Sequence, residues 1–287
     1  MGKKTVSIAM PIYNNGSFVS EAIESCLSQS FQDFEICIAD DCSTDNSVDI
    51  IRKYMDRYPD KIKLCVQDKN MGRHTIAINV NQAFDMCEGR YIAILEGDDV
   101  MLPNRLEEQL EFLENNPDCI AATHQCEVFD SQTAQVYKDF FRWLNTKNRT
   151  TAYLIKFGNH VHTPTVMFRN LPQSPFRVNP SIKKMVDWYF FIEMSMHGKI
   201  GHQDRVLTRY RRHSTNISRS DFVEDILLTL ALVEGNYPQY ISEVQQCRAY
   251  LYFSQLRKKR DIKYLKAMFT INPLLLANAL LSALIEK

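Results

Sequence analysis

The chain has 287 residues, of which 45% are hydrophobic and 24% charged, and its 34 Lys and Arg balance its 34 Asp and Glu. This composition is typical of a globular protein with a sizeable core, and zero net charge gives no whole-chain attraction to nucleic acid. The eight cysteines form no Cys-x-x-Cys pair and the N-terminus has no signal-peptide core, so we expect reduced thiols in a cytoplasmic protein. No apolar run approaches the ~20 residues that span a bilayer.

Strand-like and helix-like segments alternate through the first hundred residues. Short apolar runs predict strands at 6–10, 35–39, 62–66 and 91–95, and apolar residues at helical spacing predict helices at 18–28, 47–57 and 75–86. Ser17 is the expected N-cap of the first helix. This order predicts a parallel sheet with helices on both faces.

The pattern is less regular after Pro103. An amphipathic helix, a strand, a polar loop with a helical piece, an apolar helix and an edge strand are expected at 105–115, 120–129, 131–150, 186–197 and 206–211. Three further helices are expected at 223–234, 240–256 and 263–285.

An abrupt acidic end to the strand at 91–95 is the first feature that points to chemistry. Glu96, Asp98 and Asp99 follow the apolar run directly. Because burying unpaired carboxylates is costly, we expect them at the strand's end, in the crevice where open α/β sheets bind ligands. Clustered acids repel one another unless a cation lies between them, and oxygen ligands suit Mg²⁺ or Mn²⁺, which in turn hold a phosphate. A solvated acidic turn is the alternative.

Three more polar loops follow predicted strands or lie beside them. They are 10–15 (Met-Pro-Ile-Tyr-Asn-Asn), 40–47 (Asp-Asp-Cys-Ser-Thr-Asp-Asn-Ser) and 70–73 (Asn-Met-Gly-Arg), the last followed by Asn79. The carboxyl ends of parallel strands share one edge, so these loops should converge on one crevice. Their acids and amides can bind a base and ribose, and Tyr13 can stack on a base.

Together these motifs resemble the family-2, GT-A-fold glycosyltransferases, from Val6 to about Ser220. The resemblance implies an α/β GT-A fold, with a Rossmann-like, mostly parallel sheet flanked by helices and a C-terminal helical extension. It implies a glycosyltransferase domain at 1–220, divided into a nucleotide-sugar-binding half at 1–104 and an acceptor-binding half at 105–220. Residues 221–287 would form the helical region.

The resemblance also assigns roles to side chains of the first half. In the family the Pro-x-Tyr-Asn and Asp-Asp-x-Ser-x-Asp stretches bind the nucleoside, and an Asp-x-Asp motif, which begins here with Glu96, binds ribose and metal. Asp98 is the implied metal ligand, with Asp99 in support, and Asp41 is matched to the base edge. The implied nucleotide-binding residues are Pro11, Tyr13, Asn14, Asp41, Ser43, Asp45, Arg73, Asn79 and Glu96.

Two segments of the second half resemble the family as well. The first, 185–188, resembles the segment of the catalytic base, which makes Asp187 the implied base; helix capping is the alternative role. Trp188 is either a core residue or an acceptor-binding platform for a sugar face. The second, 210–218, resembles a Tyr-Arg-x-His segment that closes over the diphosphate. It implies that His213 binds metal or phosphate and that Arg211 or Arg212 pairs with the diphosphate.

The implied activity is an inverting, metal-assisted transfer of a sugar from a nucleotide diphosphate sugar to a hydroxyl group. UDP is the expected nucleotide, Mn²⁺ or Mg²⁺ the cofactor, and a glycan or lipid-linked glycan the acceptor. A nucleotidyltransferase that forms a sugar nucleotide and a non-catalytic nucleotide-sugar binding protein are the alternatives. The Gly-rich fingerprints of NAD-dependent enzymes and P-loop NTPases are absent from the sequence.

Two further features have more than one interpretation. His160 and His162 are spaced as a metal pair but no third ligand is evident, which favours a structural or acceptor-site role. The cations at 257–260, with Lys263 and Lys266, precede an apolar stretch at 274–285. A helix with this pattern packs on the core or rests peripherally on the inner face of the cell membrane.

Overall fold

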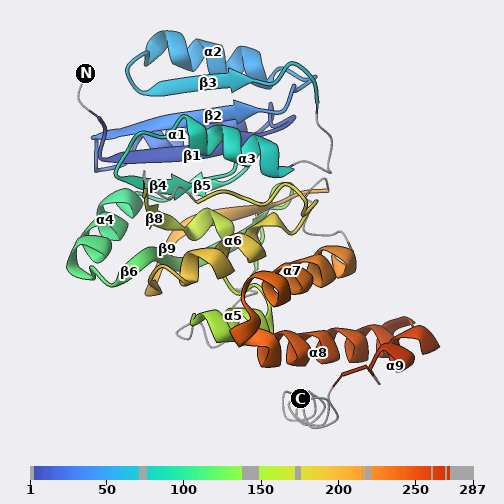
Figure 1. Ribbon diagram of the computed structural model, residues 1–287. Helices are drawn as coiled ribbons and strands as arrows, with labels where there is room; N and C mark the ends of the chain where they lie inside the picture. The colour runs from blue at the N-terminus through green and yellow to red at the C-terminus, as the bar shows by residue number, and fades with distance from the viewer. Residues whose placement is uncertain are drawn as a thin grey trace.

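A mixed nine-stranded sheet forms the centre of the computed structural model, which describes residues 3–70, 76–137, 149–171, 176–214, 216, 221–259, 261–268 and 270–271 (Figure 1). Its strands are β1 (Val6–Ile12), β2 (Phe34–Asp40), β3 (Ile62–Val66), β4 (Tyr91–Ile94), β5 (Val100–Met101), β6 (Cys119–Asp130), β7 (Val136–Tyr137), β8 (Met167–Arg169) and β9 (Lys199–Arg212). Their order is β3-β2-β1-β4-β8-β6-β9-β5, and β7 pairs with β6.

The first four strands in this order, β3-β2-β1-β4, are parallel, as the sequence predicts. Val6 of β1 is level with Phe34 of β2 and with Tyr91 of β4, so the three strands begin together. β2 and β4 are buried along their whole length, which explains their continuous apolar runs. Their carboxyl ends therefore lie at one edge of the sheet and carry the predicted polar loops.

The second half of the sheet is mixed. β8 runs antiparallel to β4 and β6, whereas β6 and β9 pair in parallel from Cys119 to Asp130. β9 also pairs with β5 on its other side, so the prediction of an edge strand at 206–211 is wrong. The reason is that β5 has two residues, too few to leave a periodic signal in the sequence.

Helices cover both faces of the sheet (Figure 1). They are α1 (Val19–Leu27), α2 (Ser47–Arg57), α3 (Ile76–Asp85), α4 (Arg105–Asn115), α5 (Thr151–Phe157), α6 (Val186–Ser195), α7 (Val223–Asn236), α8 (Ile241–Lys259) and α9 (Ile262–Met268). Buried residues of α1, α2 and α4 share one apolar cluster, and those of α3 and α6 share the other. The bounds of α2 and α4 confirm the predictions, but Phe18 is the N-cap of α1, so the assignment of Ser17 is wrong.

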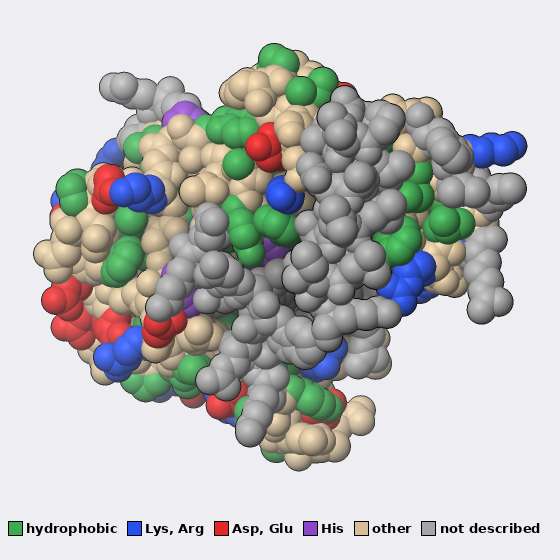
Figure 2. Space-filling model, turned by 90° about the horizontal axis from the view of Figure 1, so that it is seen from below, with side chains coloured by type: hydrophobic (Ala, Val, Ile, Leu, Met, Phe, Trp, Pro, Cys, Tyr) green, Lys and Arg blue, Asp and Glu red, His purple; other side chains and the backbone are tan. Residues whose placement is uncertain are grey.

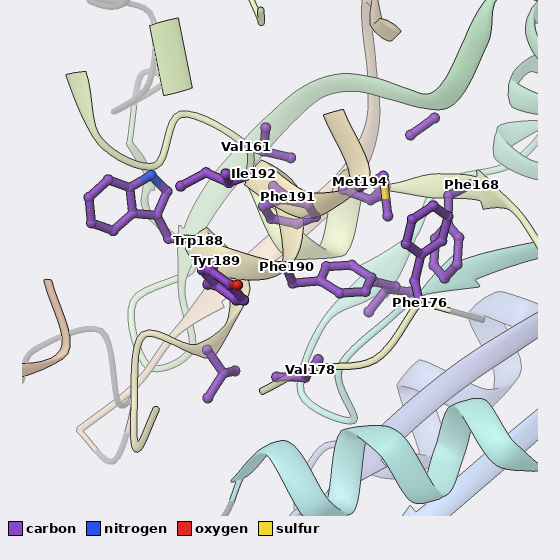
Figure 3. Packing of buried hydrophobic residues seen from close by; sticks show 14 of the residues in the cluster. Val161, Phe168, Phe176, Val178, Trp188, Tyr189, Phe190, Phe191, Ile192 and Met194 are labelled. Carbon is purple, nitrogen blue, oxygen red and sulfur yellow. The ribbon is translucent and has the colours of Figure 1, made fainter. Parts of the chain in front are cut away.

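An aromatic cluster anchors α6. Phe190 contacts the rings of Phe84, Phe168 and Phe176 at centroid distances between 5.7 and 6.3 Å (Figure 3). α6 is apolar on every side, as expected for a helix buried between other elements. This packing fixes the position of its first turn, which carries Asp187.

The C-terminal helices lie at the end of the molecule remote from α2 and β3 (Figure 1). Leu230, Val233 and Val244 belong to the same cluster as α6, which shows that α7 and α8 pack on the central domain.

No helix among the described residues is long and apolar enough to cross a membrane. The predicted helix at 263–285 is described only as α9, because Arg260 and 272–287 lie outside the described residues. Acidic and basic side chains are mixed on the described part of the face in Figure 2.

Candidate active site

The predicted acidic residues form a tight turn between β4 and β5. The backbone N–H of Asp99 donates to the carbonyl of Glu96 at 3.1 Å. A Cβ on Gly97 would come within 2.4 Å of Cγ2 of Ile12, so the turn requires glycine to pack against the end of β1. The acidic turn, residues 96–99, therefore lies beside the loop that follows β1, as expected for strand ends that share an edge.

Arg211 of β9 binds this turn from the opposite side. Its backbone N–H donates to Oδ1 of Asp99 at 2.9 Å, and its Nε donates to the carbonyl of Asp98 at 2.7 Å. Its Nη2 pairs with Glu21 of α1, and its guanidinium lies over the ring of Phe18. Through these bonds Arg211 positions Asp98, and its contact with the diphosphate stays a prediction.

Asp98 and His213, the two predicted metal ligands of opposite halves, meet at this turn. Nε2 of His213 lies 2.8 Å from Oδ2 of Asp98. The imidazole stacks on Phe18 with a centroid distance of 5.1 Å, and Oδ1 of Asn216 accepts the His213 backbone N–H. Among the described residues, no group of three or more His, Cys, Asp or Glu side chains is placed to hold a metal ion. The candidate metal ligands brought together here are thus the pair Asp98 and His213.

Burial and mutual repulsion raise the pKa values of the carboxyl groups in the acidic turn. Burial, and then the charge of Asp98, raise the pKa of Glu96 to about 8 and raise the pKa of Asp99 well above its usual value. Asp187 also raises the pKa of Glu96, so the predicted base lies close to this turn. Arg105 is fully buried behind it, where its Nη2 donates to the carbonyl of Ile94 at 3.1 Å. An added cation would relieve the repulsion among these carboxylates.

The loops after β1 and β2 are bound to each other. Asn14, in the left-handed region at φ 52°, donates its N–H to Oγ of Ser43 at 2.8 Å and accepts the Thr44 N–H on Oδ1 at 2.8 Å. Asp45 accepts the N–H of Gly16 at 2.9 Å. Asn14, Ser43 and Asp45 therefore shape the crevice through these bonds, while Tyr13, 46% exposed, presents a ring for stacking.

The other predicted nucleotide-binding residues lie in different surroundings. Nδ2 of Asn79 donates to the carbonyls of Ile12 and Ala39 at 3.1 and 3.0 Å. This buried amide joins the ends of β1 and β2, and its nucleotide contact stays a prediction. Pro11 lies in β1, and Asp41, 7% exposed, begins the loop after β2. Arg73 lies outside the described residues.

Asp187 lies in the first turn of α6, one residue after the helix begins at Val186, with Met185 at the N-cap position. Its Oδ2 accepts hydrogen bonds from Nδ2 of Asn159 at 2.6 Å and from Oγ1 of Thr163 at 3.1 Å. Burial raises the pKa of Asp187, against the lowering effect of these two donors. Backbone N–H groups of Asp187 and Trp188 also lower the pKa of this carboxyl, so it interacts with the start of the helix as well. The sequence held no signal linking Asn159 and Thr163 to a residue 24 or more positions away.

Three other predicted residues lie away from the crevice or in the core. Trp188 has no exposed surface and donates its Nε1 to the carbonyl of Leu154 at 2.9 Å, so the acceptor platform is corrected to a core residue (Figure 3). Arg212 follows Arg211 along β9 and therefore faces the other side, where it lies over Tyr137. His160 is 5% exposed, and burial lowers its pKa to about 4. It is a buried neutral residue, in keeping with the structural interpretation.

The fold is that of the GT-A class of glycosyltransferases. Residues 7–171, more than half of the chain, match the family model of glycosyl transferase family 2, and the chain belongs to that family. An uncharacterized protein of Mycobacterium tuberculosis is 27% identical over 224 residues, which are 76% of this chain and 62% of that protein. The chain thus spans less than two thirds of the length of this relative. TuaG of Bacillus subtilis, a putative teichuronic acid biosynthesis glycosyltransferase, is 36% identical over 111 residues, or 39% of this chain and 42% of that protein.

Two solved structures share the fold. Staphylococcus aureus TarS, in complex with UDP-GlcNAc, matches 93% of this chain and 79% of its own with a TM-score of 0.69 and 18% identity. The mannosyltransferase PcManGT of Pyrobaculum calidifontis, in complex with GDP-Man and Mn²⁺, matches 99% of this chain and 81% of its own with a TM-score of 0.67 and 16% identity. These likenesses define the architecture of the sheet and its helices.

Replacing Arg211 with Lys should loosen the acidic turn. Lys cannot donate to the Asp98 carbonyl and to Glu21 together in the geometry of a planar fork. We expect the free energy of unfolding to fall by about 1–3 kcal/mol in urea denaturation. The control is Arg212→Lys, one residue further along β9, which should change it by less than about 0.5 kcal/mol. Equal losses in the two variants would mean that the tie to the turn is not what Arg211 contributes.

Proposed function

We propose that the protein is an inverting glycosyltransferase. It transfers a sugar from a nucleotide diphosphate sugar, with UDP as the expected nucleotide, to a hydroxyl of a glycan or lipid-linked glycan. The observation that carries this proposal is the acidic turn at the end of β4, where Nε2 of His213 lies 2.8 Å from Oδ2 of Asp98. UDP-GlcNAc in the TarS structure supports the nucleotide, and the name of TuaG, with its role in teichuronic acid biosynthesis, supports a glycan acceptor.

The donor nucleotide would bind in the loops at the carboxyl ends of β1 and β2. The exposed ring of Tyr13 is available to stack on the base, and the carboxylate of Asp41 at the floor of the loop can accept hydrogen bonds from the base edge. The bonds of Asn14 to Ser43 and Thr44 preorganise these loops before the nucleotide arrives. The diphosphate would then extend toward the acidic turn.

The acidic turn fits a divalent metal ion. Asp98 and His213 already lie within 2.8 Å of each other, and Oε2 of Glu96 and Oδ2 of Asp99 are buried with no hydrogen-bond partner among the described residues. Mg²⁺ and Mn²⁺ are commonly held by one or two protein ligands together with substrate phosphates and water. Asp98 and His213 would hold the ion. A bound Mn²⁺ or Mg²⁺ would neutralise the charge of the leaving diphosphate.

Asp187 would act as the general base. Asn159 and Thr163 both donate to Oδ2 and orient the carboxylate, which would take the proton of the acceptor hydroxyl. As the proton moves to Asp187, the acceptor oxygen forms its bond to the anomeric carbon and the bond to the diphosphate oxygen breaks. One base on the face opposite the leaving group gives inversion at that carbon.

Cytoplasmic localisation and peripheral contact with the membrane remain part of this proposal. Lys259 pairs with Asp221 and Lys263 with Asp261, so two of the predicted cations take part in ion pairs. The apolar stretch at 274–285 lies outside the described residues. A glycan on a lipid carrier would bring the acceptor to the same membrane face.

The variant Asp98→Ala tests the metal site. Without this carboxylate His213 alone remains of the pair, so Mn²⁺-dependent affinity for UDP should fall by at least about tenfold in titration calorimetry. Asp49→Ala, which removes an exposed carboxylate on α2, should bind as the wild type does. Undiminished Mn²⁺-dependent affinity in a folded Asp98→Ala protein would place the metal elsewhere.

The variant Asp187→Asn tests the base. The amide keeps the shape of the side chain but takes no proton at neutral pH, so turnover, measured as UDP release, should fall by about 10²–10⁴-fold. UDP affinity should be retained. Glu193→Gln, on the same helix, is the matched control and should stay near the wild-type rate. Turnover of Asp187→Asn near the wild-type rate would exclude Asp187 as the base.

The pH profile of Thr163→Val tests how the base is tuned. The carboxylate is active above its pKa, so activity is lost as the pH falls through that value. Burial already raises the pKa of Asp187, and loss of the Thr163 donor should raise it further. The acid limb of the rate should move up by about half to one pH unit. Thr165→Val, in the same turn, should leave the limb in place; a shift of equal size in both variants would argue against direct tuning.

A further inference from the structure

A second cavity lies at the other end of α6 from Asp187. Asp187 is in the first turn of this helix, whereas Ser195, its last residue, lines the cavity, about 12 Å further along the helix axis. The cavity has a volume of about 900 Å³ and is bounded by the starts of β6, β9 and α5. It is therefore separate from the crevice that holds the acidic turn.

Arg149 lines this cavity in an unusual state. Its side chain is buried, at 7% exposure, and its Nε and Nη1 have no hydrogen-bond acceptor among the residues that the structure describes. A buried guanidinium without acceptors is costly, since the charge has lost its water without gaining a partner. Burial lowers the pKa of Arg149 to about 10, so the side chain still carries its charge at neutral pH.

The other charged groups of the wall are exposed or matched with one another. Lys199 pairs with Asp118 at 2.6 Å, and both side chains are more than half exposed. The carboxylate of Asp204 raises the pKa of Arg149, but this side chain is 65% exposed. Its Oδ1 lies 3.7 Å from Nε2 of His202. Water screens such surface charges, whereas the buried guanidinium is screened little. The least screened charge on the wall is therefore that of Arg149.

We propose that this cavity binds an anionic ligand, with Arg149 as the anchor for its phosphate or carboxylate group. A guanidinium binds both oxyanions through charged N–H donors, and Nε and Nη1 of Arg149 are two buried donors that have no acceptor among the described residues. The hydroxyls of Thr151 and Ser195, 2.9 Å apart on the wall, suit a ligand with further polar groups. At about 900 Å³ the cavity has room for a small molecule rather than a bare ion.

Titration calorimetry of the full chain with inorganic phosphate tests this site. Saturating UDP, with no divalent metal, keeps phosphate out of the donor crevice. Relative to the wild type, Arg149→Met should bind phosphate at least about tenfold more weakly, because it lacks the charged fork. Arg205→Met, which removes an exposed arginine of β9, and Asp98→Ala should bind phosphate as the wild type does. UDP affinity should be the same in the wild type, Arg149→Met and Arg205→Met.

A parallel titration with glucuronate separates the two ligand groups. Tighter binding of glucuronate assigns the site to a carboxylate, and tighter binding of phosphate assigns it to a phosphate group. If Arg149→Met does not fold, Arg149→Lys replaces it, since Lys keeps the charge but not the fork and should also bind more weakly. Wild-type affinity in a folded Arg149 variant, or no binding of either anion to the wild type, overturns the proposal.

Discussion

The tie between Arg211 and the acidic turn determines the geometry of the candidate site. Asp98 lies on a short turn between two strands, and the guanidinium of Arg211 holds that turn through its backbone carbonyl while Asp99 accepts the Arg211 N–H. His213 follows two residues later, directly after β9 ends at Arg212. The end of β9 therefore fixes the turn and brings the imidazole to Asp98.

The site gathers acidic side chains where water is scarce. Burial and the charge of Asp98 raise the pKa values of Glu96 and Asp99, and fully buried Arg105 offsets only part of this repulsion. Such an arrangement favours whatever brings positive charge into the crevice, which accords with the proposed divalent ion. The cavity at Arg149 instead holds a buried positive charge, which favours an anionic ligand. The two ends of α6 would therefore bind ligands of opposite charge.

Local patterns predicted the longer elements in both halves of the chain, including α4, β6 and α6, but missed the shortest strands. Buried parallel strands are continuous apolar runs, so β2 and β4 could be predicted together with the polar loops at their ends. β5 and β8, with two and three residues, are too short for any period, and the neighbours of β9 are a tertiary outcome. Residue type also could not tell that Trp188 faces the core or that the Asn79 amide joins two strands.

The contact between Asp98 and His213 joins residues 115 positions apart, and this has a consequence during synthesis. At roughly 5–20 residues per second, the ribosome would need roughly 6–23 s after making Asp98 to make His213. For that interval the strands β1 to β4 can pair while the acidic turn lacks both Arg211 and His213. The nascent chain thus has to keep a cluster of uncompensated carboxylates solvated until β9 arrives, which makes insertion of this late strand the step that closes the site.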